Sequence, residues 1–124
     1  MSSAANIYRH TGDPHKEISK YVLKVVILKK LNDWDYPYSI ANDIRKGCKE
    51  WKDHGMLSDV TKSDIYNAIS SLEKQGYIIS KAELKNGRLH KYYKTNRKGQ
   101  LALKQALKLK EEMRKAFSVL MGDE

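Results

Sequence analysis

The sequence has few of the features on which disulfide-bonded, secreted and membrane-spanning proteins depend. It contains one cysteine, Cys48, so no disulfide can form within the chain, and a single free thiol fits the reducing cytoplasm. Lysines interrupt every apolar run before it reaches the roughly 18 residues that a membrane span needs. Residues 1–6 lack a basic segment followed by an apolar one, and so do not predict a signal peptide. We therefore expect a cytoplasmic protein with no membrane partner.

Motifs of the common enzyme classes are also absent. The chain has no Gly-x-Ser-x-Gly, no Walker or Gly-x-Gly-x-x-Gly loop and no His-Glu-x-x-His. Cys48 and His54 have neither the number nor the spacing of a common metal site, and Cys48 is better interpreted as a core residue. We therefore predict no enzymatic activity, no metal and no cofactor.

Positive charge is what the sequence has in excess. It carries 24 Lys and Arg against 15 Asp and Glu, a formal net charge of +9. Such a charge on a small domain favours a polyanionic partner, either nucleic acid or an acidic membrane surface. The excess is local, because seven basic residues and one acidic residue lie between Lys81 and Lys98. Charge alone also allows a basic protein with no anionic partner.

The chain is long enough for one modest core, and its pattern predicts a mainly helical domain with a small hairpin. The predicted elements are an arm over residues 1–15, helices over 17–32, 38–51 and 61–75, strands over 77–84 and 88–95, and a last helix from Asn96 to about Met121. Apolar residues at helical spacing predict a first helix buried on most sides, through Ile18, Tyr21, Val22, Val25, Val26, Ile27, Leu28 and Leu31. The second helix presents Ile40, Ala41, Ile44, Cys48 and Trp51 inward.

Short-range signals define the third helix and the hairpin. Thr61 followed by Asp64 is a capping pair, and Gly76 can take the left-handed position after the last turn. Asn86-Gly87 between the two strands is typical of a tight type I′ turn. We therefore expect the helix to run from Thr61 to Gln75 and the hairpin to turn at Asn86.

The third helix has two unlike faces. At about 100° per residue, Ile65, Ile69 and Leu72 form a core stripe on one side. The opposite side carries Ser63, Asn67, Ser70 and Lys74. Small polar side chains let a helix approach base edges, and Asn can pair with adenine. An ordinary solvated face is the alternative interpretation of this helix.

Three helices followed by a basic hairpin are typical of the winged helix-turn-helix, in which the third helix enters the DNA major groove and the hairpin contacts backbone or minor groove. The predicted DNA-binding residues are Lys62, Ser63, Asn67, Ser70, Lys74, Lys85, Arg88, His90 and Lys91. Strand lysines also protect exposed edges from aggregation, which is the alternative explanation of the basic hairpin.

These elements carry a motif that resembles the PadR family of transcriptional regulators. Its parts are Ile65-Tyr66-x-x-Ile69-x-x-Leu72-Glu73-x-x-Gly76-Tyr77-Ile78, then Tyr92-Tyr93, then Asn96-x-x-Gly99, with Tyr38-Ser39-Ile40-Ala41 similar to the family's second helix. The resemblance spans roughly residues 18–117. Asn96 stands where Thr is usual, Ser39-Ile40 lacks the usual preceding Gly, and residues 46–57 form a longer segment. The resemblance implies a homodimer joined through the last helix, with a contribution from the first, and a repressor.

The last helix independently predicts a dimer. Steps of four and three residues connect Ala102, Ala106, Leu109, Met113, Ala116 and Leu120, and these residues with Phe117 are the predicted interface. Leu103, Leu107 and Met121 lie beside them. We therefore divide the chain into an arm (1–15), a winged-helix DNA-binding domain (16–95) and a dimerisation helix (96–124). A last helix folded wholly onto its own domain is the alternative.

Two further functions remain open: a winged helix that binds protein instead of double-stranded DNA, and a protein that binds RNA or a membrane surface. The latter lacks an exposed aromatic platform beyond Tyr92 and Tyr93, and strand alternation turns only one of these outward. The last helix contains no Trp, and Trp34 and Trp51 lie elsewhere. The residues therefore do not support a small-molecule effector of the kind that some PadR-like proteins bind at the dimer interface.

Overall fold

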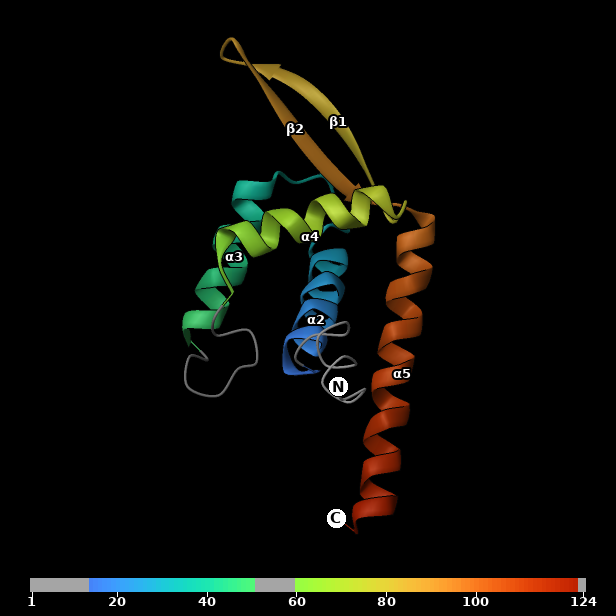
Figure 1. The fold of residues 1–124 in the computed structure, drawn as a ribbon. Helices are drawn as coiled ribbons and strands as arrows, with labels where there is room; N and C mark the ends of the chain where they lie inside the picture. The colour runs from blue at the N-terminus through green and yellow to red at the C-terminus, as the bar shows by residue number, and fades with distance from the viewer. Residues whose placement is uncertain (1–13, 51–59, 123–124) are drawn as a thin grey trace, which may run out of the picture.

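The fold was analysed in a computed structural model, which describes residues 14–50 and 60–122. Its elements are α2 (Pro14–Lys30), α3 (Pro37–Glu50), α4 (Lys62–Lys74), β1 (Ile78–Lys85), β2 (Arg88–Thr95) and α5 (Arg97–Met121). Helices α2, α3 and α4 pack together, the β1–β2 hairpin projects from the end of α4, and α5 runs back along α2 (Figure 1). The predicted class, mainly helical with a two-stranded hairpin and a long last helix, is confirmed.

The predicted boundaries hold to within a few residues. Helix α2 begins at Pro14, inside the predicted arm. Proline is tolerated in the first turn of a helix, because an N–H at that position would have no acceptor within the helix. The rest of the arm, residues 1–13, lies outside the described residues, as do Trp51 and His54 of the segment before α4.

Both ends of α4 form as their sequence signals predict. The Asp64 N–H donates to Thr61 Oγ1 at 3.1 Å, and the Thr61 N–H donates to the Asp64 carboxylate at 2.9 Å, which completes a capping box. At the other end Gly76 has φ of +82°. The N–H groups of Gly76 and Tyr77 donate to the carbonyls of Glu73 and Leu72, both at 3.0 Å, which is the Schellman arrangement.

The hairpin turns at Asn86-Gly87, where φ is +53° and +75°, as a type I′ turn requires. Its strands pair directly from Ile78 with Thr95 to Lys85 with Arg88. A third segment joins the free edge of β2, because Asp35 and Tyr93 exchange two backbone hydrogen bonds of 3.0 and 2.8 Å. The sequence did not predict this pairing, which places the connection between α2 and α3 against the hairpin.

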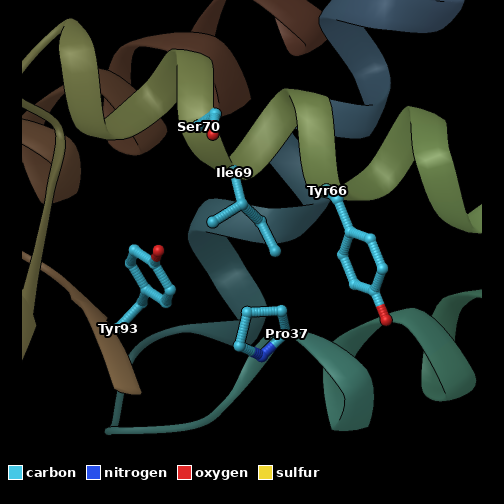
Figure 2. Close-up of a pocket in the computed structure, with 5 residues that line it drawn as sticks. All are labelled: Pro37, Tyr66, Ile69, Ser70 and Tyr93. Atoms are coloured by element: carbon cyan, nitrogen blue, oxygen red, sulfur yellow. The ribbon is translucent and has the colours of Figure 1, made fainter. Parts of the chain in front are cut away.

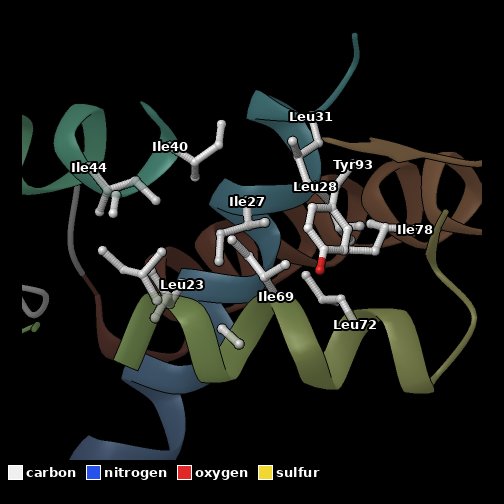
Figure 3. Close-up of a cluster of buried hydrophobic side chains, with 13 residues drawn as sticks. Leu23, Ile27, Leu28, Leu31, Ile40, Ile44, Ile69, Leu72, Ile78 and Tyr93 are labelled. Atoms are coloured by element: carbon white, nitrogen blue, oxygen red, sulfur yellow. The ribbon is translucent and has the colours of Figure 1, made fainter. Parts of the chain in front are cut away.

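The core lies where α4 crosses α2 and α3 (Figure 3). Its largest fully buried side chains are Ile27, Leu31, Ile40, Ile65 and Leu72. The predicted α4 stripe is therefore confirmed, and so is the inward face of α3 at Ile40, Ala41 and Ile44. Cys48 is partly buried against this core, and burial raises the pKa of its thiol, which keeps it protonated.

The expectation that α2 is buried on most sides is wrong for its N-terminal half. Ile18 is 52% exposed and Tyr21 is 49% exposed, whereas Ile27 and Leu31 are buried. The reason is that α4 crosses α2 toward the C-terminal end of α2 and leaves the opposite end uncovered on that side (Figure 1). An apolar surface remains on α2 in a single copy of the chain.

The junction between β2 and α5 is bonded to two other elements. Thr95 donates to two carbonyls near the end of α2, from its N–H to Leu31 and from its hydroxyl to Leu28, both at 2.8 Å. Asn96 donates from its N–H to the Tyr77 carbonyl at 3.1 Å and accepts the Gly99 N–H at 2.9 Å, which caps α5 as predicted. Gly99 is buried beneath Tyr77, in a space with no room for a side chain.

Two Gly-to-Ala substitutions test this close approach. In Gly99→Ala, the new methyl group would collide with the Tyr77 carbonyl and lie 2.6 Å from Thr95 Cγ2, so we expect a loss of stability. The free energy of unfolding should fall by about 1–3 kcal/mol. In Gly47→Ala, the methyl group meets nothing within 4 Å, and helix propensity should raise stability by about 0.5–1 kcal/mol. Urea unfolding at one fixed protein concentration measures both, and changes of the same sign would contradict the described packing.

Candidate nucleic-acid interface

The outer face of α4 presents the predicted polar residues to solvent. Ser63, Asn67, Ser70 and Lys74 are all exposed, on the side of the helix opposite the buried Ile65. Lys62, in the first turn, lies with its ammonium 5.0 Å from the centre of the Tyr38 ring of α3. The structure therefore brings Ser63, Asn67, Ser70 and Lys74 together on one accessible face of α4, whereas Lys62 lies toward α3.

A shallow pocket of about 240 Å³ lies beside this face, between α4, the start of α3 and β2. Figure 2 shows its lining residues, which are Pro37, Tyr66, Ile69, Ser70 and Tyr93. Ser70 thus belongs to the wall of a pocket as well as to the outer face. The pocket is formed without residues of α5, so it is distinct from the apolar surface of that helix.

Tyr66 is a surface residue of this site that the helical-wheel pattern of α4 did not predict. Its side chain is 39% exposed and lies between the outer face of α4 and the pocket. The signal that could have found it was present in the motif Ile65-Tyr66, because a residue next to the buried stripe lies at the border between core and solvent.

The hairpin register divides its basic residues between two faces. Directly paired residues share a face, and successive residues alternate. The inner face packs on the core at its base and carries Ile78, Ser80, Ala82 and Leu84 opposite Thr95, Tyr93, Lys91 and Leu89. The outer face carries Ile79, Lys81, Glu83 and Lys85 opposite Lys94, Tyr92, His90 and Arg88. Of the predicted hairpin residues, Lys85, Arg88 and His90 are therefore on the outer face and Lys91 on the inner face.

Lys91 has partners on α4 and β2. Its ammonium lies 3.6 Å from the Glu73 carboxylate, which also accepts the Ser80 hydroxyl at 2.8 Å. A hydrogen bond with Tyr93, together with the nearby Glu73 charge, raises the pKa of Lys91, so the ammonium stays protonated. These contacts connect the hairpin to α4, and they leave less of the Lys91 charge available to another partner.

Aromatic rings and lysines alternate on the outer face, an arrangement that the sequence analysis missed. Trp34 lies with its ring 4.5 Å from the Lys81 ammonium and 6.0 Å from that of Lys94. Tyr36 meets Tyr92 edge-on, at a ring separation of 5.9 Å. Trp34 and Tyr36 reach the hairpin because Asp35 between them pairs with β2. Tyr93 is buried, which confirms that only one tyrosine of the Tyr92-Tyr93 pair faces outward.

Across residues 14–50 and 60–122, no helix is long and apolar enough to cross a membrane. The described part of the chain also contains no group of three or more His, Cys, Asp or Glu placed to hold a metal ion.

Three helices, a two-stranded hairpin after the third and a long last helix define a winged helix-turn-helix protein. The sequence profile of the transcriptional regulator PadR-like family matches residues 27–105, more than half of the chain. The chain belongs to that family. No curated protein matches it by sequence.

Solved structures share the fold. A transcriptional regulator from Clostridium thermocellum is 25% identical with a TM-score of 0.67, over 84% of this chain and 94% of that one. A PadR family regulator from Eggerthella lenta is 17% identical with a TM-score of 0.67, over 98% of each chain. Bacillus subtilis PadR, solved in complex with operator DNA, is 22% identical with a TM-score of 0.58, over 69% of this chain and 46% of that one.

The division of the basic residues between the two faces of the hairpin predicts how each of them contributes to binding of duplex DNA. Lys85→Ala and Arg88→Ala should weaken binding to every sequence alike. Each should also reduce the slope of log affinity against log salt concentration by about one for each phosphate contact that is lost. Lys91→Ala should flatten it less, because Glu73 already lies beside that ammonium. Fluorescence anisotropy titrations across a salt series measure the slopes. An equal change for Lys91→Ala, or a change only in the preferred sequence, would contradict this partition.

Proposed function

We propose that this protein is a sequence-specific DNA-binding transcriptional repressor that acts as a homodimer in the cytoplasm. In this proposal, residues 16–95 bind DNA, with α4 in the major groove and the hairpin on the backbone or minor groove, and residues 96–124 form the dimer. The observation that carries it is the outer face of α4, a row of small polar side chains beside a basic hairpin. Family membership and a fold shared with a PadR solved on operator DNA support the same function.

Asn67 is the best candidate for a base contact on α4. It is exposed on the side opposite the buried Ile65, and it lies in the first half of the helix, the end that usually approaches base edges. Ser63 and Ser70, about one turn away in each direction, are too short to hold the helix away from a groove. An amide at this place can donate to and accept from adenine.

The apolar surface of α5 supports a dimer. Near its start, Ala102 and Leu103 pack against the core of their own domain. Farther along, the helix extends past the domain (Figure 1). Its large apolar side chains there are between 48% and 81% exposed, namely Leu107, Leu109, Met113, Phe117, Val119, Leu120 and Met121. Many exposed apolar side chains along one helix are typical of an interface. A second copy that covered it, together with Ile18 and Tyr21 of α2, would bury both exposed surfaces.

The base-reading role is tested first by selecting binding sites from random duplexes, and then by Asn67→Ala. On the selected operator the substitution should cost about 1–3 kcal/mol of binding free energy, and much less on random DNA. Stability should change by no more than about 0.5 kcal/mol, because the side chain is exposed.

The matched control is Asn42→Ala, at an exposed position of α3. It should leave the ratio of operator affinity to random-DNA affinity unchanged. If Asn67→Ala weakens operator and random DNA equally, Asn67 contacts phosphate. If it weakens neither, the outer face of α4 does not bind DNA.

The dimer is tested by placing charge on α5. Leu109→Glu with Met113→Glu should give a monomer or an aggregating chain, because two carboxylates cannot be buried without partners. Lys104→Glu with Lys108→Glu, on the opposite and already polar side of the same helix, should leave the dimer intact. Light scattering measures the mass of each variant. An unchanged dimer mass after the first pair of substitutions would rule out this interface.

A further inference from the structure

The tip of the hairpin carries two exposed leucines. The phosphate contacts proposed for Lys85 and Arg88 give these leucines no role. Leu84 is 74% exposed and Leu89 is 73% exposed. In the described part of the chain, only Val119 and Leu120 at the end of α5 are more exposed among the large apolar side chains. The two leucines pair directly across the strands, one position before Lys85 and Arg88 close the turn. They form a single apolar contact surface, which we call the leucine pair.

The leucine pair lies on the inner face of the hairpin. This is the face that buries Ile78 and Tyr93 at its base and that Lys91 connects to Glu73 of α4. The hairpin then projects past α4, so its tip is far from the other helices (Figure 1). The leucine pair is therefore continuous with the α4 side of the molecule, but lies beyond the reach of any described residue that could cover it.

Resting on the proposed function, we infer that the leucine pair enters the minor groove of the duplex that α4 binds. Proteins that kink DNA from the minor groove use apolar side chains, Leu among them, which they insert between base steps. Lys85 and Arg88 alternate with the leucines and point to the other face, so cations lie immediately beside the apolar surface on both strands. A groove with apolar walls and phosphate rims matches this combination.

Charge favours DNA over a second copy of the hairpin as the occupant. The segment that forms the tip carries Lys81, Lys85, Arg88 and Lys91, with Glu83 as the only acidic residue between Lys81 and Lys91. Two such tips would repel each other, whereas a polyanion would release counterions on contact. The leucine pair would then add a contact that does not depend on salt, next to contacts that do.

A matched pair of double variants separates apolar contact from hairpin stability. Leu84→Val with Leu89→Val keeps an apolar tip, and Leu84→Thr with Leu89→Thr replaces it with side chains of the same shape that are polar. Both residue types favour strands, so the hairpin should form in each variant. Affinity for the operator selected from random duplexes should be about tenfold weaker for the Thr variant than for the Val variant. The slope of log affinity against log salt should be equal in the two, because no charge changes.

Each outcome of these titrations supports or overturns the inference. A weaker Thr variant with an unchanged slope supports it, provided that the two variants have similar thermal stability. Equal affinities would overturn it and leave the proposed function intact, since the wild-type protein still binds. A Thr variant that loses stability as well as affinity would show that the pair maintains the hairpin, and would also overturn it. If the wild-type protein binds no duplex, the proposed function fails and this inference fails with it.

Discussion

The arrangement of the molecule depends on the short junction from Thr95 to Gly99. The last carbonyls of a helix have no partner within that helix, and here two of those near the end of α2, Leu28 and Leu31, accept hydrogen bonds from Thr95. The next residue, Asn96, bonds to Gly76 and Tyr77 just beyond the end of α4. One turn of chain therefore bonds to the end of α2 and to the residues that follow α4, and it begins α5. The directions in which the hairpin and α5 leave the core follow from these bonds.

Through this junction, the end of the proposed reading helix is hydrogen-bonded to the start of the proposed dimer helix. The side-chain amide of Asn96 donates to the Gly76 carbonyl, just after α4, and accepts the Gly99 N–H in the first turn of α5. In a dimer joined through α5, the packing of the two last helices would then set the separation of the two α4 helices. Half-site spacing on DNA would be a property of the α5 contact as much as of the DNA-binding domain.

Short-range signals explain why much of the fold was predictable. The Thr61–Asp64 box, Gly76, Asn86-Gly87 and the Asn96 cap all involve residues within a few positions of one another, and all formed as expected. The division of the hairpin between two faces could also have been predicted, since alternation alone separates His90 from Lys91.

The features that escaped prediction are contacts between distant segments. Nothing near Trp34 in the sequence indicates that Asp35 will pair with Tyr93, or that Lys81 will lie against the indole. The exposure of Ile18 likewise depends on where α4 crosses α2, which apolar spacing within one helix does not specify. The candidate site was therefore predictable on α4, where one helix wheel defines it, and less so on the hairpin, where Lys91 acquires a partner from another element.

The lysines that lie over aromatic rings have a consequence for the free-energy cost of binding an anion. A long cationic side chain free in solvent samples many rotamers, and ordering it on binding costs about 1.5–2 kcal/mol. Lys81 and Lys94 beside Trp34, and Lys85 beside Tyr92, already have preferred positions in the free protein. A cation held in this way needs less reorganisation when an anion arrives. In the proposed complex with DNA, the outer face of the hairpin is thus preorganised for the phosphates that it would contact.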